Sequence, residues 1–249
     1  LTVSDIDNTN PASATVTISN GFLAGDTLSA TTTGTSVTAS YDAVNHRLNL
    51  TGSDTVANYN AVLDSVTFSS TSDNPTNIGG AASTTRGIQW VVNDGATNNN
   101  LSSPTSSTIN ITAINDAPVA TAGRTLSYTE NAAAAVLDNT VTLSDPDNSF
   151  LIGATVSISS GRTTGDVLGF VNQNGISGSY DATNGTLTLS GNSSLANYQT
   201  ALRSVTYVST SENPTITSSS RTISWVVNDG SSSNNLSAAV TSTIPITAA

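Results

Sequence analysis

Residues 88–95 read Ile-Gln-Trp-Val-Val-Asn-Asp-Gly, and residues 223–230 read Ile-Ser-Trp-Val-Val-Asn-Asp-Gly. In the second copy, the apolar residues Ile223, Trp225 and Val227 lie at alternate positions. A period of two is typical of a strand that turns one face to a core. The Asn-Asp-Gly that follows favours a turn and leaves a carboxylate at the end of the strand. Each copy therefore predicts one half-buried strand that carries a large aromatic residue.

The two copies belong to an internal repeat. Ala57-Asn58-Tyr59 recurs as Ala196-Asn197-Tyr198, and the Trp strands recur in the same order after them. A repeat of this length predicts two tandem domains, residues 1–114 and 115–249. Residues 117–142 have no counterpart in the first copy, so we expect the first domain to lack its first strand. We also expect the chain to be part of a longer tandem array.

Short β-rich segments punctuated by turns predict an all-β fold of two sandwiches. One exception is the segment 194–202, where the spacing of Leu195, Tyr198 and Leu202 favours a short helix. In the second copy we expect strands at 126–129, 139–144, 154–159, 167–170, 176–180, 186–190, 205–208, 222–227 and 241–247.

The composition excludes several classes of function. The chain has 249 residues, a formal net charge of −11, one His and no Cys, so disulfides and thiol chemistry are absent. Strong negative charge argues against nucleic acid and anionic membranes as partners, and no apolar run is long enough to insert into a membrane. A single His and the absence of a Gly-x-Ser-x-Gly motif give catalysis no support, so we expect no enzyme.

Acidic residues follow the ends of the predicted strands. If strand direction alternates, the residues after the strand at 139–144 and after the second Trp strand lie at one end of the second sandwich. Asn115-Asp116 enters at that end, which would face a loop of the first sandwich. The residues expected to converge there are Asp73, Asn115, Asp116, Asp145, Asp147 and Asp229. Carboxylates gathered in this way require a cation, and six to eight oxygen ligands are typical of Ca²⁺.

The same pattern predicts weaker sites elsewhere. Asp5, Asp7 and Asp94 repeat the arrangement at the corresponding end of the first domain. Glu130 and Glu212 fall at the opposite end of the second domain, where they would face a neighbour. Zn²⁺ is not expected with one His and no Cys.

Other residues receive structural interpretations. We interpret Asp26, Asp42, Asp166 and Asp181 as turn residues, because Asp caps loops and tolerates unusual backbone angles. Trp90 and Trp225 alternate with Ile and Val, which favours core tryptophans over exposed platforms for sugars.

Several of these motifs resemble those of cadherins. They are Asp145-Pro-Asp147 after a strand, Asn115-Asp116-Ala117-Pro118 in the linker and Glu130-Asn131. Ser72-Asp-Asn-Pro75 and Ser211-Glu-Asn-Pro214 are similar to the cadherin acidic loop. The order Ala-Thr-Val-x-Ile, Ala-Asn-Tyr, Ser-Val-Thr-Tyr, Val-Asn-Asp-Gly most closely resembles the bacterial cadherin-like tandem repeats of large surface adhesins. That resemblance implies Ig-like or cadherin-like β-sandwiches joined into a calcium-stiffened extender.

We therefore expect a structural, calcium-stiffened repeat segment of an extracellular adhesin or matrix fibre at the cell surface. Its expected partners are neighbouring repeats of the same or identical chains, with surface glycans as a second class. One alternative is a calcium-dependent carbohydrate-binding module. Another is the subunit of a self-assembling extracellular filament, in which a neighbouring chain donates the missing strand.

Overall fold

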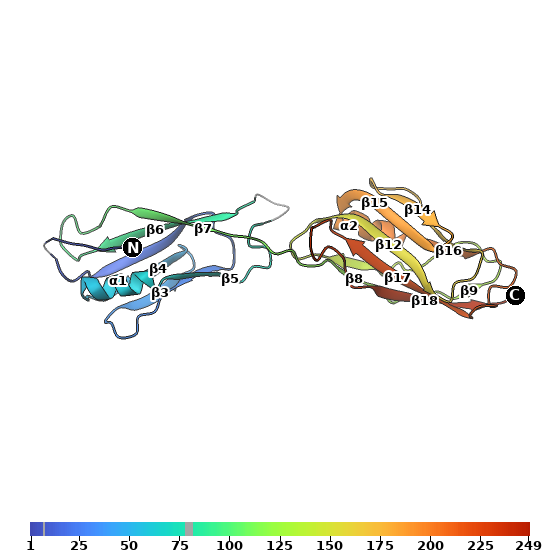
Figure 1. Cartoon of the computed structure of the whole chain (residues 1–249), viewed down its shortest axis with the longest axis horizontal. Coiled ribbons are helices and arrows are strands. Elements are labelled where there is room, and N and C mark those ends of the chain that lie inside the picture. Colours follow the sequence, from blue (N-terminus) through green and yellow to red (C-terminus); the bar gives the residue numbers. More distant parts are fainter. Residues whose placement is uncertain (7, 78–81) are drawn as a thin grey trace. The chain divides into compact units, whose positions relative to one another are not determined.

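The computed structural model describes residues 1–6, 8–77 and 82–249 (Figure 1). Its contacts divide the chain into two compact units, unit 1 (Leu1–Ala113) and unit 2 (Ile114–Ala249). Each unit consists of β-strands and, in its described part, one short helix, so the all-β prediction is confirmed. No helix in the described ranges is long and apolar enough to cross a membrane.

Unit 1 contains a five-stranded sheet in the order β3–β4–β1–β6–β7. The bounds of these strands are β1 (Ser13–Asn20), β3 (Thr38–Asp42), β4 (Arg47–Thr51), β6 (Thr85–Asn93) and β7 (Thr105–Asn110). A separate pair consists of β2 (Asp26–Ser29) and β5 (Thr67–Ser70). In the sequence, helix α1 (Val56–Asp64) comes between β4 and β5.

Unit 2 repeats this plan and adds β9 to the main sheet, β10 to the second sheet and a separate pair of strands. Its main sheet has the order β14–β15–β12–β17–β18–β9. These strands are β14 (Ser177–Asp181), β15 (Thr186–Ser194), β12 (Phe150–Ser160), β17 (Ser220–Asn228), β18 (Val240–Thr247) and β9 (Tyr128–Thr129). The second sheet is formed by β10 (Ala135–Val136), β16 (Thr206–Ser209) and β13 (Asp166–Gly169). A further pair joins β8 (Val119–Thr121) to β11 (Thr142–Ser144), and helix α2 (Leu195–Arg203) precedes β16.

The repeated Ala-Asn-Tyr motif marks the helices. In unit 2 the Ser194 side chain caps α2 by accepting a bond from Asn197 N at 3.2 Å. Tyr198 is fully buried, and its hydroxyl donates to Gly191 O at 2.6 Å. The same bond joins Tyr59 to Gly52 O in unit 1. The predicted helix over 194–202 is confirmed within one residue at each end.

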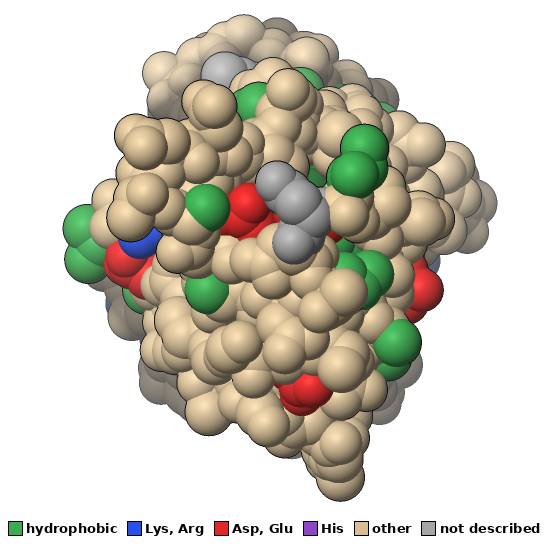
Figure 2. Space-filling model, turned by 90° about the vertical axis from the view of Figure 1, so that its left-hand side faces the viewer, with side chains coloured by type: hydrophobic (Ala, Val, Ile, Leu, Met, Phe, Trp, Pro, Cys, Tyr) green, Lys and Arg blue, Asp and Glu red, His purple; other side chains and the backbone are tan. Residues whose placement is uncertain are grey.

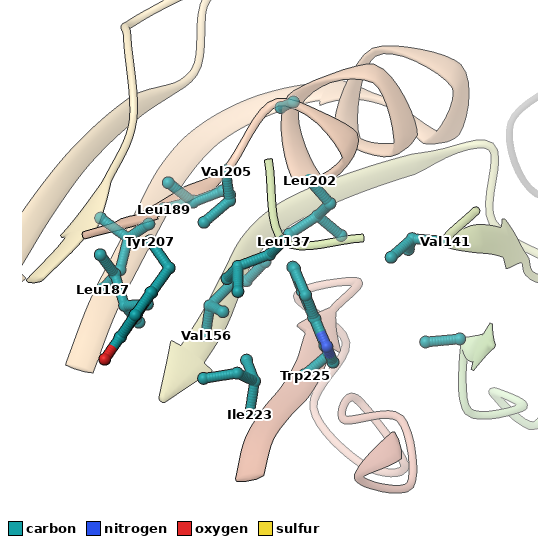
Figure 3. Packing of buried hydrophobic residues seen from close by; sticks show 14 of the residues in the cluster. Leu137, Val141, Val156, Leu187, Leu189, Leu202, Val205, Tyr207, Ile223 and Trp225 are labelled. Atoms are coloured by element: carbon teal, nitrogen blue, oxygen red, sulfur yellow. The ribbon is translucent and has the colours of Figure 1, made fainter. Parts of the chain in front are cut away.

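The Trp strand β17 lies at the centre of the unit 2 core. Trp225 is 1% exposed and packs among side chains from both sheets and from α2 (Figure 3). Its Nε1 donates to Ser242 Oγ at 3.0 Å, which satisfies the one polar atom of the ring. Trp90 makes the same bond to Ser107 Oγ at 2.9 Å, but its ring is only partly buried. The prediction of a core tryptophan therefore holds fully for Trp225 alone.

Two of the predicted turn aspartates belong to buried ion pairs. Arg86 Nε lies 2.5 Å from Asp26 Oδ2, and Arg221 Nε lies 2.6 Å from Asp166 Oδ2. Asp26 and Asp166 do accept turn bonds, from Leu23 N at 2.9 Å and from Thr163 N at 2.8 Å, but the interpretation of them as turn residues alone overlooked the cation that faces each carboxylate. Asp42 and Asp181 do act in turns, each accepting bonds from two backbone amides of its own hairpin.

Candidate calcium site

One polar network joins the segment that enters unit 2 to two of its loops. Asn115 Nδ2 donates to Asp229 Oδ2 at 2.9 Å in the loop after β17. Its Oδ1 accepts bonds from Ser231 Oγ at 2.6 Å and from Asn148 Nδ2 at 3.1 Å, the latter in the loop after β11. Its backbone oxygen accepts from Asn234 Nδ2 at 2.9 Å. Asn115 therefore ties the entering segment to both acidic loops.

A pair of carboxylates lies beside this amide. Asp145 Oδ1 accepts bonds from Asp147 N at 3.1 Å and from Asn148 N at 2.8 Å. Asp147 is 2% exposed, and its Oδ2 accepts from Asp116 N at 3.1 Å. The Asp145 Oδ2 atom is buried and has no hydrogen-bond partner among the described residues. The structure thus brings together five of the six residues predicted for this site, all of them in unit 2.

The electrostatics of the pair favour a cation. Burial raises the pKa of the Asp145 carboxyl to about 6; the backbone amide of Asn148 opposes that rise, and the Asp147 carboxyl adds to it. A neighbouring carboxylate disfavours the ionised form of Asp145. A bound divalent cation would reverse the local field and favour that form.

The donor set fits a hard cation that accepts mixed oxygen ligands. In the described parts of the chain, no three His, Cys, Asp or Glu side chains come close enough to hold a metal by themselves. Ca²⁺ also takes amide and backbone carbonyl oxygens, which Asn115 and its neighbours supply. Asp145 and Asp147 would hold such an ion together with the amide oxygen of Asn115, and Asp229 adjoins them through the bond it accepts from Asn115 Nδ2.

Unit 1 repeats part of this arrangement. Asn8 N donates to Asp5 Oδ1 at 3.1 Å, as Asn148 N does to Asp145, and Asn8 Nδ2 donates to Asp94 O at 2.7 Å. Asp5 and Asp94 line one cavity of about 150 Å³. Asp7 lies outside the described residues. Figure 2, which views the left-hand end of Figure 1, shows a few acidic side chains on a mostly uncharged polar surface.

The remaining predicted ligands lie elsewhere. Asp73 is an exposed loop residue of unit 1, and Glu212 is an exposed loop residue of unit 2. Glu130 is 9% exposed and accepts a bond from Ala249 N at 2.9 Å, away from the Asn115 network. Their parts in metal binding stay predictions.

Sequence reasoning missed the amides and hydroxyls of the network. Asn148, Ser231 and Asn234 supply donors to it, yet apart from Asn115 only acids were singled out. Two signals could have found them. Asn148 repeats Asn8 after each Asp-x-Asp, and Asn234 repeats Asn99, both with a positive φ near 50°.

No family model matches the chain. Over 106 residues, or 40% of this chain, the sequence is 33% identical to halomucin of Haloquadratum walsbyi and spans 1% of that protein. Similar solved structures include a protocadherin gammaB7 EC3-6 cis-dimer, at 13% identity and a TM-score of 0.32, covering 89% of this chain and 41% of that one. Human protocadherin-24 EC1-2 is 13% identical with a TM-score of 0.31, covering 90% and 83%. Zebrafish RET cadherin-like domains 1 to 4 are 12% identical with a TM-score of 0.28, covering 94% and 41%.

Proposed function

We propose that the chain is a structural repeat segment of an extracellular adhesin or matrix fibre, stiffened by Ca²⁺. The observation that carries this proposal is the position of Asn115. Its side chain accepts bonds from the loops after β11 and after β17, and its Nδ2 donates to Asp229 in the second of these. An ion held at the same place would fix the start of unit 2 to the acids of both loops.

The linker between the two units is short, so an ion bound at Asn115 would restrict its motion. Ile111 is still paired with unit 1, through its amide and Thr84 O at 2.8 Å. Asn115 is already tied into unit 2, so only Thr112, Ala113 and Ile114 remain between the two anchored residues. Each residue spans at most about 3.6 Å. Fixing Asn115 and Asp116 would therefore leave only these three residues free to bend.

Without an ion the same residues would weaken the connection. Asp147 and Asp229 are buried and Asp145 is half-buried, and like charges in such positions repel by about a kcal/mol or more at intermediate dielectric. The Asn115 amide offsets this repulsion only in part, because it brings dipoles and no positive charge. The proposed partners are neighbouring repeats of the same kind, which would continue the fibre.

The structure offers little support for the alternative of a sugar platform on Trp225. The ring is 1% exposed, and its Nε1 is already bonded to Ser242.

Calcium is expected to raise the thermal stability of unit 2. A ligand that binds only the folded state stabilises it by about 2.7 kcal/mol when its free concentration is about 100 times Kd. We expect melting curves in millimolar Ca²⁺ to lie clearly above those in excess chelator. The Asp147→Asn variant should lose most of this difference, whereas Asp181→Asn, which changes the charge of an exposed hairpin, should keep it. Superimposable curves for the parent chain would remove the calcium hypothesis.

A further inference from the structure

The loop after β17 holds the segment that enters unit 2 by its backbone as well as by its side chains. Asn234 Nδ2 donates to the backbone oxygen of Asn115 at 2.9 Å. In return, Asn115 Nδ2 lies 3.2 Å from Ser233 O and 3.3 Å from Asn234 O. Asn115 and Asn234 therefore contact each other in both directions, and we call this pair of residues the amide clasp.

The backbone of the loop sets the direction of the Asn234 side chain. Asn234 has a φ of 51°, in the left-handed region that asparagine tolerates better than most residues. Two further bonds close the loop around it. Asp229 N donates to Asn235 O at 3.1 Å, and Asn235 Nδ2 donates to Asn228 Oδ1 at 3.2 Å. The Asn234 amide therefore projects from a hydrogen-bonded loop toward the entering segment.

Asn234 is not among the ligands assigned to the candidate calcium site. The ion is expected beside Asp145 Oδ2, a buried oxygen that has no hydrogen-bond partner among the described residues. Asn115 would contribute its side-chain oxygen, whereas Asn234 bonds to the main-chain oxygen of the same residue. Any effect of Asn234 on the ion would therefore act through the position of Asn115.

The clasp also bears on the residue that follows. Asp116 N donates to Asp147 Oδ2 at 3.1 Å, which joins the entering segment to the loop after β11. Asp116 comes directly after Asn115 in the chain, so a displacement of Asn115 would break this bond as well. The amide clasp therefore supports the contacts of the entering segment with both acidic loops.

Holding Asn115 before the ion arrives lowers the cost of binding. A ligand that must order its own site loses affinity, because the ordered residues give up conformational entropy. A segment that already lies in place spares the ion part of this loss. The clasp alone is weak, because Asn234 is exposed and its bond competes with water. It favours the bound position of the segment and leaves the lasting hold to the ion.

We propose that Asn234 is a positioning residue of the calcium site, which holds Asn115 against the loop after β17 before the ion binds and so raises the affinity for Ca²⁺. This inference rests on the proposed function, because it concerns the same ion. It adds that a neutral side chain outside the ligand set determines how tightly the ion is held.

The first test uses hydrogen exchange of the full chain in excess chelator, followed by NMR. Asn234→Gly keeps the positive φ and removes the donor. Asn234→Asp keeps the shape of the side chain and its tolerance of that φ, but its carboxylate cannot donate. Both variants should lose most of the protection of the Asp116 amide, whereas the amides of β12 and β17 should keep theirs. Unchanged protection of the Asp116 amide in both variants would overturn the proposal, as would an equal loss in the two core strands.

The second test measures Ca²⁺ binding to the full chain by isothermal titration calorimetry. The component of the isotherm that is abolished by Asp145→Asn with Asp147→Asn belongs to the site in unit 2. For this component, Asn234→Gly should raise Kd about tenfold. The matched control is Asn99→Gly, which makes the same change at a φ of 52° in the equivalent loop of unit 1 and should leave this Kd unchanged.

The outcomes separate this inference from the proposed function. If the parent binds Ca²⁺ in unit 2 and Asn234→Gly binds it equally well, the inference fails and the proposed function stands. An equal loss of affinity in Asn99→Gly would also overturn the inference, because the effect would then not pass through Asn115. A parent chain that binds no Ca²⁺ would overturn both.

Discussion

Replacing Asp166 with alanine should lower the free energy of unfolding of unit 2 by about 3–5 kcal/mol, the usual cost of breaking a buried ion pair. Arg221 has no exposed surface, and its guanidinium would lose the carboxylate that lies 2.6 Å from Nε. Its other donors would keep Ser218 O and Pro214 O, which are neutral acceptors. The Tyr207 hydroxyl, which donates to Asp166 Oδ1 at 2.6 Å, would lose its acceptor as well.

Denaturant unfolding followed by Trp225 fluorescence in a Trp90→Phe background measures this effect. Asp181→Ala is the matched control, since that carboxylate is exposed in a hairpin of the same unit, and its loss should have a much smaller effect on the free energy of unfolding. The double variant Asp166→Leu with Arg221→Met removes both charges and should cost less than Asp166→Ala alone. A single variant as stable as the parent would contradict the assignment of the pair to the core.

The second large effect concerns the two tryptophans, which have the same strand position but different burial. Trp225→Ala should cost about 3–5 kcal/mol, as for other buried aromatic truncations. Trp90→Ala should cost clearly less, about 1–2 kcal/mol, because its ring is already partly exposed and little new cavity forms. Each substitution removes a tryptophan and its fluorescence. Both costs are therefore measured by denaturant unfolding followed by circular dichroism. Equal costs would contradict the partial burial of Trp90.

Much of the fold follows from local patterns. Alternation around Trp225 placed β17, and the spacing of Tyr198 and Leu202 placed α2, because burial of one face dictates the residue type at each of these positions. The strands β8 and β10 were not predicted. They have three and two residues, and segments this short carry too few positions to show a period.

The ion pairs and the candidate calcium site differ in how much of each can be predicted from the sequence. Arg221 lies two residues before Ile223 on the buried face of β17, a signal that could have placed the cation in the core. Its partner Asp166 lies 55 residues away, and no local pattern joins the two. The acids of the candidate site were predicted because they follow strands. The central position of Asn115 depends on contacts with Asp229 and Ser231, more than a hundred residues away, which only the folded chain displays.

The central claim is that an ion bound around Asp145, Asp147 and Asp229 stiffens the chain. Charge substitution separates this claim from general effects of calcium on an acidic protein. The variant Asp145→Asn with Asp147→Asn removes two charges from the site, and both residues lie in the loop after β11, so unit 2 should stay folded. The variant Asp42→Asn with Asp181→Asn removes two charges from exposed hairpins and leaves the site intact.

Small-angle X-ray scattering of the full chain in chelator and in millimolar Ca²⁺ tests the claim most directly. We expect Ca²⁺ to lengthen the parent chain and to narrow the distribution of its dimensions. The hairpin variant should respond as the parent does, and the Asp145→Asn/Asp147→Asn variant should not respond. If the parent shows no change, or if the site variant responds as the parent does, calcium does not stiffen the chain through these residues.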